Sequence, residues 1–206
     1  MKRMKVPVLP LTGVIVTVLL SAASSIAGPL EDADAALEAK DYQTAVRLLR
    51  PLAEQGDAKA QVALGEMYAF GEGVPESDEQ AAIWFRKAAD QGDASAQDHL
   101  GDMYLKGIGV PPDYAQAVIW YRKSAVQGDT FGQLDLSVMY EQGIGVPQDF
   151  VQAYMWLNLA AAQGGDELTS MGLSTITKDR DELAAKMTPE QIAEAQRLAR
   201  EWKPTK

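Results

Sequence analysis

Cysteine is absent from the 206-residue sequence, and histidine occurs only once, as His99. Without cysteine the chain has no disulfide, no thiolate metal site and no thiol nucleophile. A single histidine excludes a multi-histidine metal site, and we expect His99 to be an exposed structural residue rather than a catalytic one. The motifs S-x-x-K, G-x-S-x-G and H-E-x-x-H are missing too. The sequence therefore predicts no enzyme activity, no cofactor and no metal site.

Basic residues are scarce. Lysine and arginine number 19 against 29 aspartate and glutamate residues, which gives a formal net charge of −10. A chain of this charge repels phosphate backbones and anionic lipid surfaces, so nucleic-acid binding is not expected. Apolar residues make up 47% of the chain, a share typical of a globular protein rather than of a disordered or fibrous one.

Long apolar runs are confined to the N-terminus. Three positive charges within residues 1–5 precede the apolar stretch Val6–Leu20, and small residues follow up to Ala27. This order predicts a secretory signal peptide over residues 1–27, cleaved after about Ala27. The alternative is an uncleaved membrane anchor, because Val6–Ile26 is just long enough to span a bilayer. We expect cleavage, which would leave an exported chain, periplasmic or secreted, with no membrane span.

A period of 36 residues dominates the rest of the chain. The tripeptide Gln-Gly-Asp begins at Gln55, Gln91 and Gln127, and a weaker copy begins at Gln163. A fixed period of this size is typical of stacked supersecondary units. The features that keep the same step are the Met-Tyr pairs at Met67, Met103 and Met139, the Gly-Val-Pro loops at Gly73, Gly109 and Gly145, and the tryptophans Trp84, Trp120 and Trp156.

Each unit is predicted to form two helices. Asp57 can cap a first helix that runs to about Phe70, and Gly71 can end it in a left-handed turn. Ser77 can cap the second helix, which ends at Gly92, and its periodic tryptophan is expected to pack in the core rather than to bind a ligand. The predicted fold is all-α, a right-handed α-solenoid of antiparallel helix pairs: an N-terminal pair at 28–56, repeats at 57–92, 93–128 and 129–164, and capping helices at 165–206.

The third repeat departs from the pattern of the first two. Ser137 replaces a glycine, Gly132 replaces an alanine, and Asn158-Leu159 replaces an Arg-Lys pair. Beyond it, the run Thr188-Pro-Glu-Gln191 predicts a helix start with proline in the first turn. The face that follows is apolar, as a capping helix requires, and consists of Ile192, Ala195, Ala199 and Trp202.

These motifs resemble the Sel-one-like repeat family, a relative of the tetratricopeptide repeats. The pattern A-x-x-x-L-G-x-M-Y stands at Ala60–Tyr68, G-x-G-V-P at Gly71–Pro75, A-x-x-W-x-x-K-A-A at Ala81–Ala89, and Q-G-D at 91–93. The resemblance implies an α-solenoid that binds other proteins or peptides. Exported bacterial members are associated with envelope assembly, exopolysaccharide systems and signalling regulation.

The leading functional prediction is an exported protein–protein interaction scaffold without catalysis, whose partner and oligomeric state stay open. One alternative is a cell-wall-related enzyme or penicillin binder, since some cysteine-rich relatives are described as β-lactamases. This chain lacks the cysteines of that branch. The other alternative is a membrane-tethered signalling regulator that keeps residues 1–27.

The predicted binding surface is the concave side, which the first helices line in tetratricopeptide-like arrays. Positions that differ between repeats are expected to carry recognition, because the shared positions are used in packing. From the first repeat to the third, this surface changes from acidic to apolar. The acidic part favours a basic partner segment. Whether the C-terminal tail covers the apolar part is left open. The candidate binding residues are Val62, Glu66, Asp98, Asp102, Leu105, Phe131, Leu134 and Val138.

Overall fold

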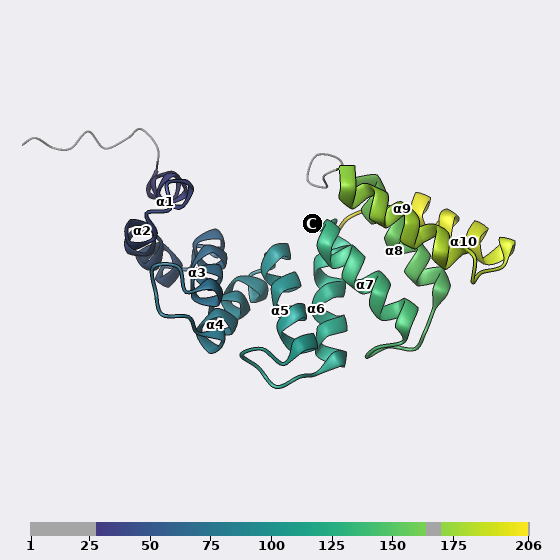
Figure 1. Cartoon of the computed structure of the whole chain (residues 1–206), viewed down its shortest axis with the longest axis horizontal. Coiled ribbons are helices and arrows are strands. Elements are labelled where there is room, and N and C mark those ends of the chain that lie inside the picture. The colour runs from purple at the N-terminus through teal and green to yellow at the C-terminus, as the bar shows by residue number, and fades with distance from the viewer. Residues whose placement is uncertain (1–27, 164–169, 206) are drawn as a thin grey trace, which may run out of the picture.

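A computed structural model describes residues 28–163 and 170–205, so the predicted signal peptide lies outside the described residues. Throughout these two ranges the regular elements are helices, which follow one another along an arc (Figure 1). The predicted all-α solenoid is confirmed. The helices are α1 (Pro29–Glu38), α2 (Tyr42–Glu54), α3 (Ala58–Phe70), α4 (Asp78–Asp90), α5 (Ala94–Lys106), α6 (Tyr114–Gln127), α7 (Thr130–Gln142), α8 (Phe150–Gln163), α9 (Ser170–Ala184) and α10 (Pro189–Glu201).

The predicted caps set the bounds of the first helices. The Asp57 carboxylate accepts a hydrogen bond from the Ala60 N–H at 2.8 Å, and Asp93 caps α5 in the same way. At the other end of α3, Gly71 adopts the left-handed conformation with φ of 67°. Because a residue with a Cβ is strained there, the glycine ends the helix and turns the chain into the loop before α4.

Close contact between the two helices of a repeat depends on a glycine. A Cβ atom built on Gly65 would lie 2.7 Å from the Phe85 ring, and one on Gly101 would lie 2.6 Å from the Tyr121 ring. No side chain fits at these distances without a shift of the ring. The aromatic ring of the second helix therefore lies directly on the backbone of the first helix.

Glutamine side chains link one repeat to the next. Gln61 donates from Nε2 to the Ala53 carbonyl at 2.9 Å, and its Oε1 accepts from Gln91 Nε2 at 2.7 Å. One period later, Gln97 donates to the Ala89 carbonyl at 3.1 Å. These bonds satisfy polar groups that would otherwise be buried unpaired at the boundary, so the recurrence of glutamine every 36 residues has a structural cause.

Cations and aromatic rings form a second series along the array. Arg50 donates to the Tyr68 hydroxyl at 3.2 Å, and the equivalent bonds join Arg86 to Tyr104 and Arg122 to Tyr140. The three periodic tryptophans are buried, as predicted from their spacing. The ammonium groups of Lys87 and Lys123 lie 3.8 and 3.7 Å from the ring centroids of Trp84 and Trp120, within the range of a cation–π interaction.

The C-terminal helices close the array. Thr188 and Gln191 form the reciprocal capping box that starts α10, as predicted, and α10 packs on α8 with Ala195 fully buried. Trp202 meets Trp156 edge to face, with ring centroids 6.2 Å apart. The chain then turns back toward the junction of α6 and α7 (Figure 1), where the Thr205 N–H donates to the Val126 carbonyl at 2.8 Å.

Candidate functional site

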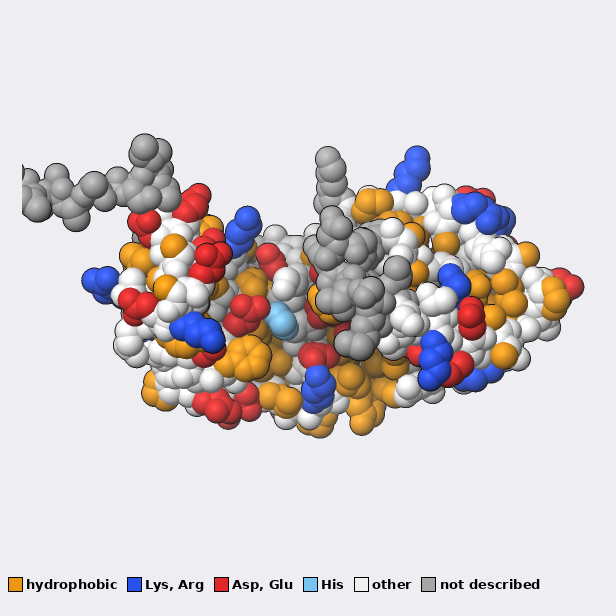
Figure 2. Space-filling model, turned by 45° about the horizontal axis from the view of Figure 1, so that its top comes forward, with side chains coloured by type: hydrophobic (Ala, Val, Ile, Leu, Met, Phe, Trp, Pro, Cys, Tyr) orange, Lys and Arg blue, Asp and Glu red, His pale blue; other side chains and the backbone are white. Residues whose placement is uncertain are grey.

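The predicted binding residues lie on the first helices α3, α5 and α7. On this side of the molecule the single histidine lies in a hollow among acidic side chains, with apolar side chains close by (Figure 2). We call this side the first-helix face. Within the part of the chain that the structure describes, these helices line a cavity between α7 and α9 and another between α3 and α5.

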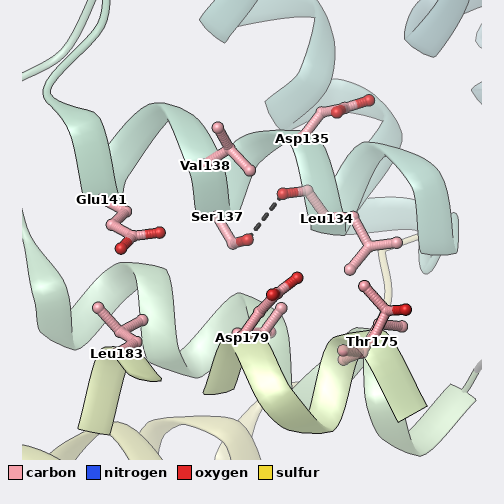
Figure 3. Close-up of a pocket in the computed structure, with 10 residues that line it drawn as sticks. Leu134, Asp135, Ser137, Val138, Glu141, Thr175, Asp179 and Leu183 are labelled. Carbon is pink, nitrogen blue, oxygen red and sulfur yellow. Dashed lines mark hydrogen bonds between the residues drawn. The ribbon is translucent and has the colours of Figure 1, made fainter. Parts of the chain in front are cut away.

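The cavity between α7 and α9 has a volume of about 340 Å³. Leu134 and Val138 of α7 line one side, and Ile176 and Leu183 of α9 line the other (Figure 3). The remaining lining residues are Asp135, Ser137, Glu141, Leu157, Thr175 and Asp179.

This cavity follows from the departures in the third repeat. Leu157 stands where the first two repeats have the rings of Phe85 and Tyr121, and Ser137 stands where they have glycine. A leucine fills less space than an aromatic ring, and both residues line the cavity. The Ser137 hydroxyl donates to the Leu134 carbonyl at 2.7 Å (Figure 3). Its polarity is thereby satisfied within the helix, and the wall of the cavity stays largely apolar.

The C-terminal tail forms the opposite wall of the apolar patch and does not bury it. Leu134 is half-buried against α9, whereas Phe131 remains 54% exposed and Val138 41% exposed. Lys186, just after α9, pairs with Glu141 of α7 at 2.8 Å. The tail therefore does not cover the apolar patch. The third repeat and the tail each form one wall of a groove.

The cavity between α3 and α5 has a volume of about 270 Å³. Phe70, which is 72% exposed, stands at its edge. His99 lies inside it and stacks on Phe85 with ring centroids 4.6 Å apart, while its Nε2 is 3.4 Å from Glu66. The expectation of an exposed histidine is thus wrong, because the ring packs against Phe85 and is half-buried. The other lining residues are Ala69, Asp78, Asp102, Met103, Lys106 and Ile108.

Three carboxyl groups lie between the cavities, on α5 and α7. We call Asp98, Asp102 and Asp135 the acidic centre. Asp102 accepts a hydrogen bond from the Tyr121 hydroxyl at 2.6 Å and pairs with Lys106. Burial, together with the nearby Asp135 charge, raises the pKa of Asp98 to about 8. Burial and the Asp102 charge raise the pKa of Asp135 to about 6, and a hydrogen bond with Asp98 opposes that rise.

The acidic centre changes the interpretation of one predicted residue. A carboxyl group with a pKa of about 8 is largely protonated at pH 7, so Asp98 adds little negative charge to the surface. Its Oδ1 atom is buried without a hydrogen-bond partner among the described residues. Asp135, which the sequence did not select, lines the α7/α9 cavity in its place. Asp135 occupies the same repeat position as His99, and this position differs in every repeat. That variation could have identified Asp135 as a candidate binding residue.

The environment of His99 is also acidic. Burial lowers the pKa of His99, but the bond to Glu66 and the charges of Glu66, Asp98 and Asp102 together outweigh it, so the pKa is raised. Glu66 and Asp102, both predicted as binding residues, line the α3/α5 cavity. The structure places Val62 and Leu105 differently, since they are half-buried against the core clusters and line neither cavity.

The described residues contain no group of three or more histidine, aspartate or glutamate side chains arranged to hold a metal ion. Within the same ranges, no helix has the length and apolar character needed to cross a membrane.

Comparisons with known proteins agree with the geometry of the repeats. A family model described as the Sel1 repeat matches residues 36–57, 58–93, 94–129 and 130–165. No curated protein sequence matches the chain.

Solved structures are similar as well. The crystal structure of a protective antigen present in uropathogenic Escherichia coli strains, which displays an SLR fold, is 38% identical with a TM-score of 0.68 and covers 78% of this chain. That of a Sel1 repeat protein from Oxalobacter formigenes is 33% identical with a TM-score of 0.64 and covers 68% of this chain. The chain spans only 32% and 56% of these two proteins, respectively.

Proposed function

Because the chain belongs to the Sel1 repeat family, whose helical solenoids are generally protein interaction scaffolds, we propose that it binds a segment of a partner protein in the groove between α7 and α9. The supporting observation is that this groove is open and apolar although its second wall is already in place. Phe131 and Val138 remain exposed beside it. An exposed apolar patch with a polar rim is typical of a protein interaction site.

The rim of the groove favours a basic segment. Asp135, Glu141 and Asp179 line it, and none of the described side chains that line it is positively charged. Lys186 already pairs with Glu141, so Asp135 and Asp179 carry this preference. The occupant would place an apolar side chain between Leu134 and Leu183 and its lysine or arginine residues against the rim. Charge complementarity of this kind steers association and selects among partners.

The proposal includes no catalytic step. Burial and the charges of neighbouring carboxylates account for the raised pKa values of Asp98 and Asp135, and His99 is held by Phe85 and Glu66. The alternative of a penicillin binder makes a simple contrary prediction. Incubation with a penicillin followed by intact-mass measurement should leave the mass unchanged, and a covalent adduct would favour the alternative.

We also propose that residues 1–27 direct export and are removed after Ala27. The support is the order of charge, apolar run and small residues in the sequence. In addition, α1 begins at Pro29, so cleavage after Ala27 would leave every described helix intact. The intact mass of the protein from the exported fraction tests this: a chain starting at Gly28 is expected, whereas retention of residues 1–27 would support the membrane-tethered regulator.

The groove proposal is tested by site-specific photo-crosslinking in cells. A photoreactive amino acid is placed at Val138, which lines the groove, and in a matched variant at Ile119, which is similarly exposed on α6 and lines neither groove. We expect a crosslinked partner from position 138 that is lost when Leu134→Asp is added, with helicity unchanged. Equal crosslinking from both positions would contradict a specific groove.

A further inference from the structure

On the basis of the proposed function, we infer that the bound segment has two apolar anchors, one in the α7/α9 cavity and one in the α3/α5 cavity, with basic residues between them over the acidic centre. This inference deepens the proposal above by specifying the chemistry and spacing of the partner segment.

The repeat register places both cavities on the same face. Asp102 lines the α3/α5 cavity, and Val138, which is one period of 36 residues later, lines the α7/α9 cavity. His99 and Asp135 are related by the same step and likewise line one cavity each. Residues at equivalent positions of stacked repeats lie on the same side of the array, turned by the small rotation from one repeat to the next, so one ligand can reach both cavities from this side.

The surface between the cavities is polar rather than hollow. In the second repeat the Tyr121 ring fills the position that Leu157 leaves partly empty in the third. Above that ring its hydroxyl meets Asp102, and Asp98 and Asp135 lie alongside. Among the described residues this stretch presents Asp102, which already pairs with Lys106, and the carboxyl groups of Asp98 and Asp135, whose ionised forms a lysine or arginine would stabilise.

The distance between the cavities sets the spacing of the anchors. The α3/α5 and α7/α9 grooves are separated by two steps between neighbouring first helices. These helices make few direct contacts, since α4 packs on α5 and α6 packs on α7. Each step is therefore at least the roughly 8–10 Å that separates packed helices, and the cavities are at least about 16–20 Å apart. An extended chain spans about 3.3 Å per residue, so the two anchors should be at least about six residues apart. Separations of six and eight residues place both side chains on the same side of an extended segment.

The inference also predicts that binding of a basic segment is coupled to the release of a proton. A cation placed over the acidic centre favours the ionised forms of Asp98 and Asp135, so binding should release a proton near pH 7. The other charged groups that face these two carboxyls are Asp102, His99 and Lys106 of α5 and Asp129 at the start of α7. A ligand that occupies only an apolar cavity would lack this effect.

The experiment uses synthetic peptides and the purified chain. Each peptide carries two leucines separated by two, five or seven residues that alternate lysine and serine, and calorimetry measures affinity and proton release in two buffers. We expect the better of the two longer spacers to bind about tenfold more tightly than the two-residue spacer, with proton release and strong salt dependence. The same peptide with acetylated lysines should lose both charge signatures.

Variants separate the two cavities. Phe70→Ser alters an exposed side chain at the α3/α5 cavity, Val138→Arg blocks the α7/α9 cavity, and Ile119→Ser is the matched control on α6. We expect either cavity variant to remove the preference for a longer spacer, and the control to keep it. Circular dichroism checks that the helices are intact in each variant.

The outcomes distinguish the inference from the proposed function. If only Val138→Arg weakens binding, the second anchor is wrong and the groove proposal stands. If both variants bind like the unmodified chain, or no peptide binds, both are wrong. A dimer that forms at binding concentrations and is abolished by Val138→Arg would overturn the inference in favour of a second copy of the chain as the occupant.

Discussion

The first two repeats and the third repeat use different residues to pack their two helices together and to cover their tryptophan. In residues 57–128 an aromatic ring lies on a glycine within each repeat, and each periodic tryptophan has a lysine over its ring. In the third repeat Leu157 and Ser137 replace the ring and the glycine, Leu159 replaces the lysine, and Trp202 covers Trp156. The regular residues bring the two helices of a repeat into close contact, whereas the departures line the α7/α9 groove and form the surface on which α10 packs.

The largest contrast concerns the position that is lysine in the first two repeats and Leu159 in the third. Leu159 is buried near α10, so Leu159→Lys should destabilise the protein by about 3 kcal/mol or more through a buried unpaired charge. The reverse change, Lys123→Leu, alters an exposed residue and should cost less than about 1 kcal/mol. Urea denaturation followed by circular dichroism measures both, and equal losses would show that α10 does not depend on this departure.

The glycine position gives the second contrast. Gly101→Ala should cost about 1–3 kcal/mol, because the new Cβ would lie 2.6 Å from the buried Tyr121 ring. Ser137→Ala, at the equivalent position of the third repeat, should cost less than about 1 kcal/mol for one hydrogen bond.

A double variant tests this comparison further by placing the serine and the leucine of the third repeat at the equivalent positions of the second. In the double variant Gly101→Ser with Tyr121→Leu, the smaller side chain makes room for the serine, so stability should exceed that of Gly101→Ser alone. The same denaturation curves test it. A double variant as unstable as the sum of the two single changes would show that the ring and the glycine do not act as a pair.

The acidic centre lies where the second repeat meets the third, and it predicts that the free energy of unfolding depends on pH. The folded pKa of Asp98, about 8, lies above the unfolded value, so the folded state holds an extra proton between about pH 4 and pH 8. Stability should therefore fall by about 1–3 kcal/mol from pH 5 to pH 8. Asp98→Asn should flatten this slope, and Asp90→Asn, an exposed control, should not. An unchanged slope in Asp98→Asn would mean that Asp98 is ionised in the folded state.

The smallest loss of stability is expected at a contact that the third repeat shares with the first two. The Arg–Tyr bond recurs across both, from Arg86 to Tyr104 and from Arg122 to Tyr140. Tyr104→Phe and Tyr140→Phe should therefore each cost less than about 1 kcal/mol, and by similar amounts, since partly exposed bonds of this kind contribute little. Thermal melts compare the two variants, and a large difference would reveal a role for one tyrosine beyond the periodic contact.

The periodic part of the fold was predictable from the sequence, because local rules and register act together there. Asp57 caps α3, Gly71 ends it, and Trp84 is buried, as their spacing indicated. Each of these features depends on residues within one repeat or its neighbour. The sequence pattern therefore carried enough information to place them.

The site was only partly predictable. Glu66, Asp102, Leu134 and Val138 line the cavities, but α9, which lies beyond the periodic region and has no register to inherit, supplies the second wall of the groove. The raised pKa of Asp98 likewise depends in part on the charges of Asp135 and Asp129, which belong to the next repeat, so the residue type and its helix face did not reveal it.

The glutamine and arginine links have a consequence for how such genes change. Within the repeats each link joins residues fewer than 36 positions apart, such as Arg86 with Tyr104 and Gln91 with Gln61. Duplication or excision of one 36-residue unit by recombination would therefore re-form the same bonds across the new junction. The number of units could then drift between lineages, while the spacing of the two cavities lengthens or shortens by whole repeats.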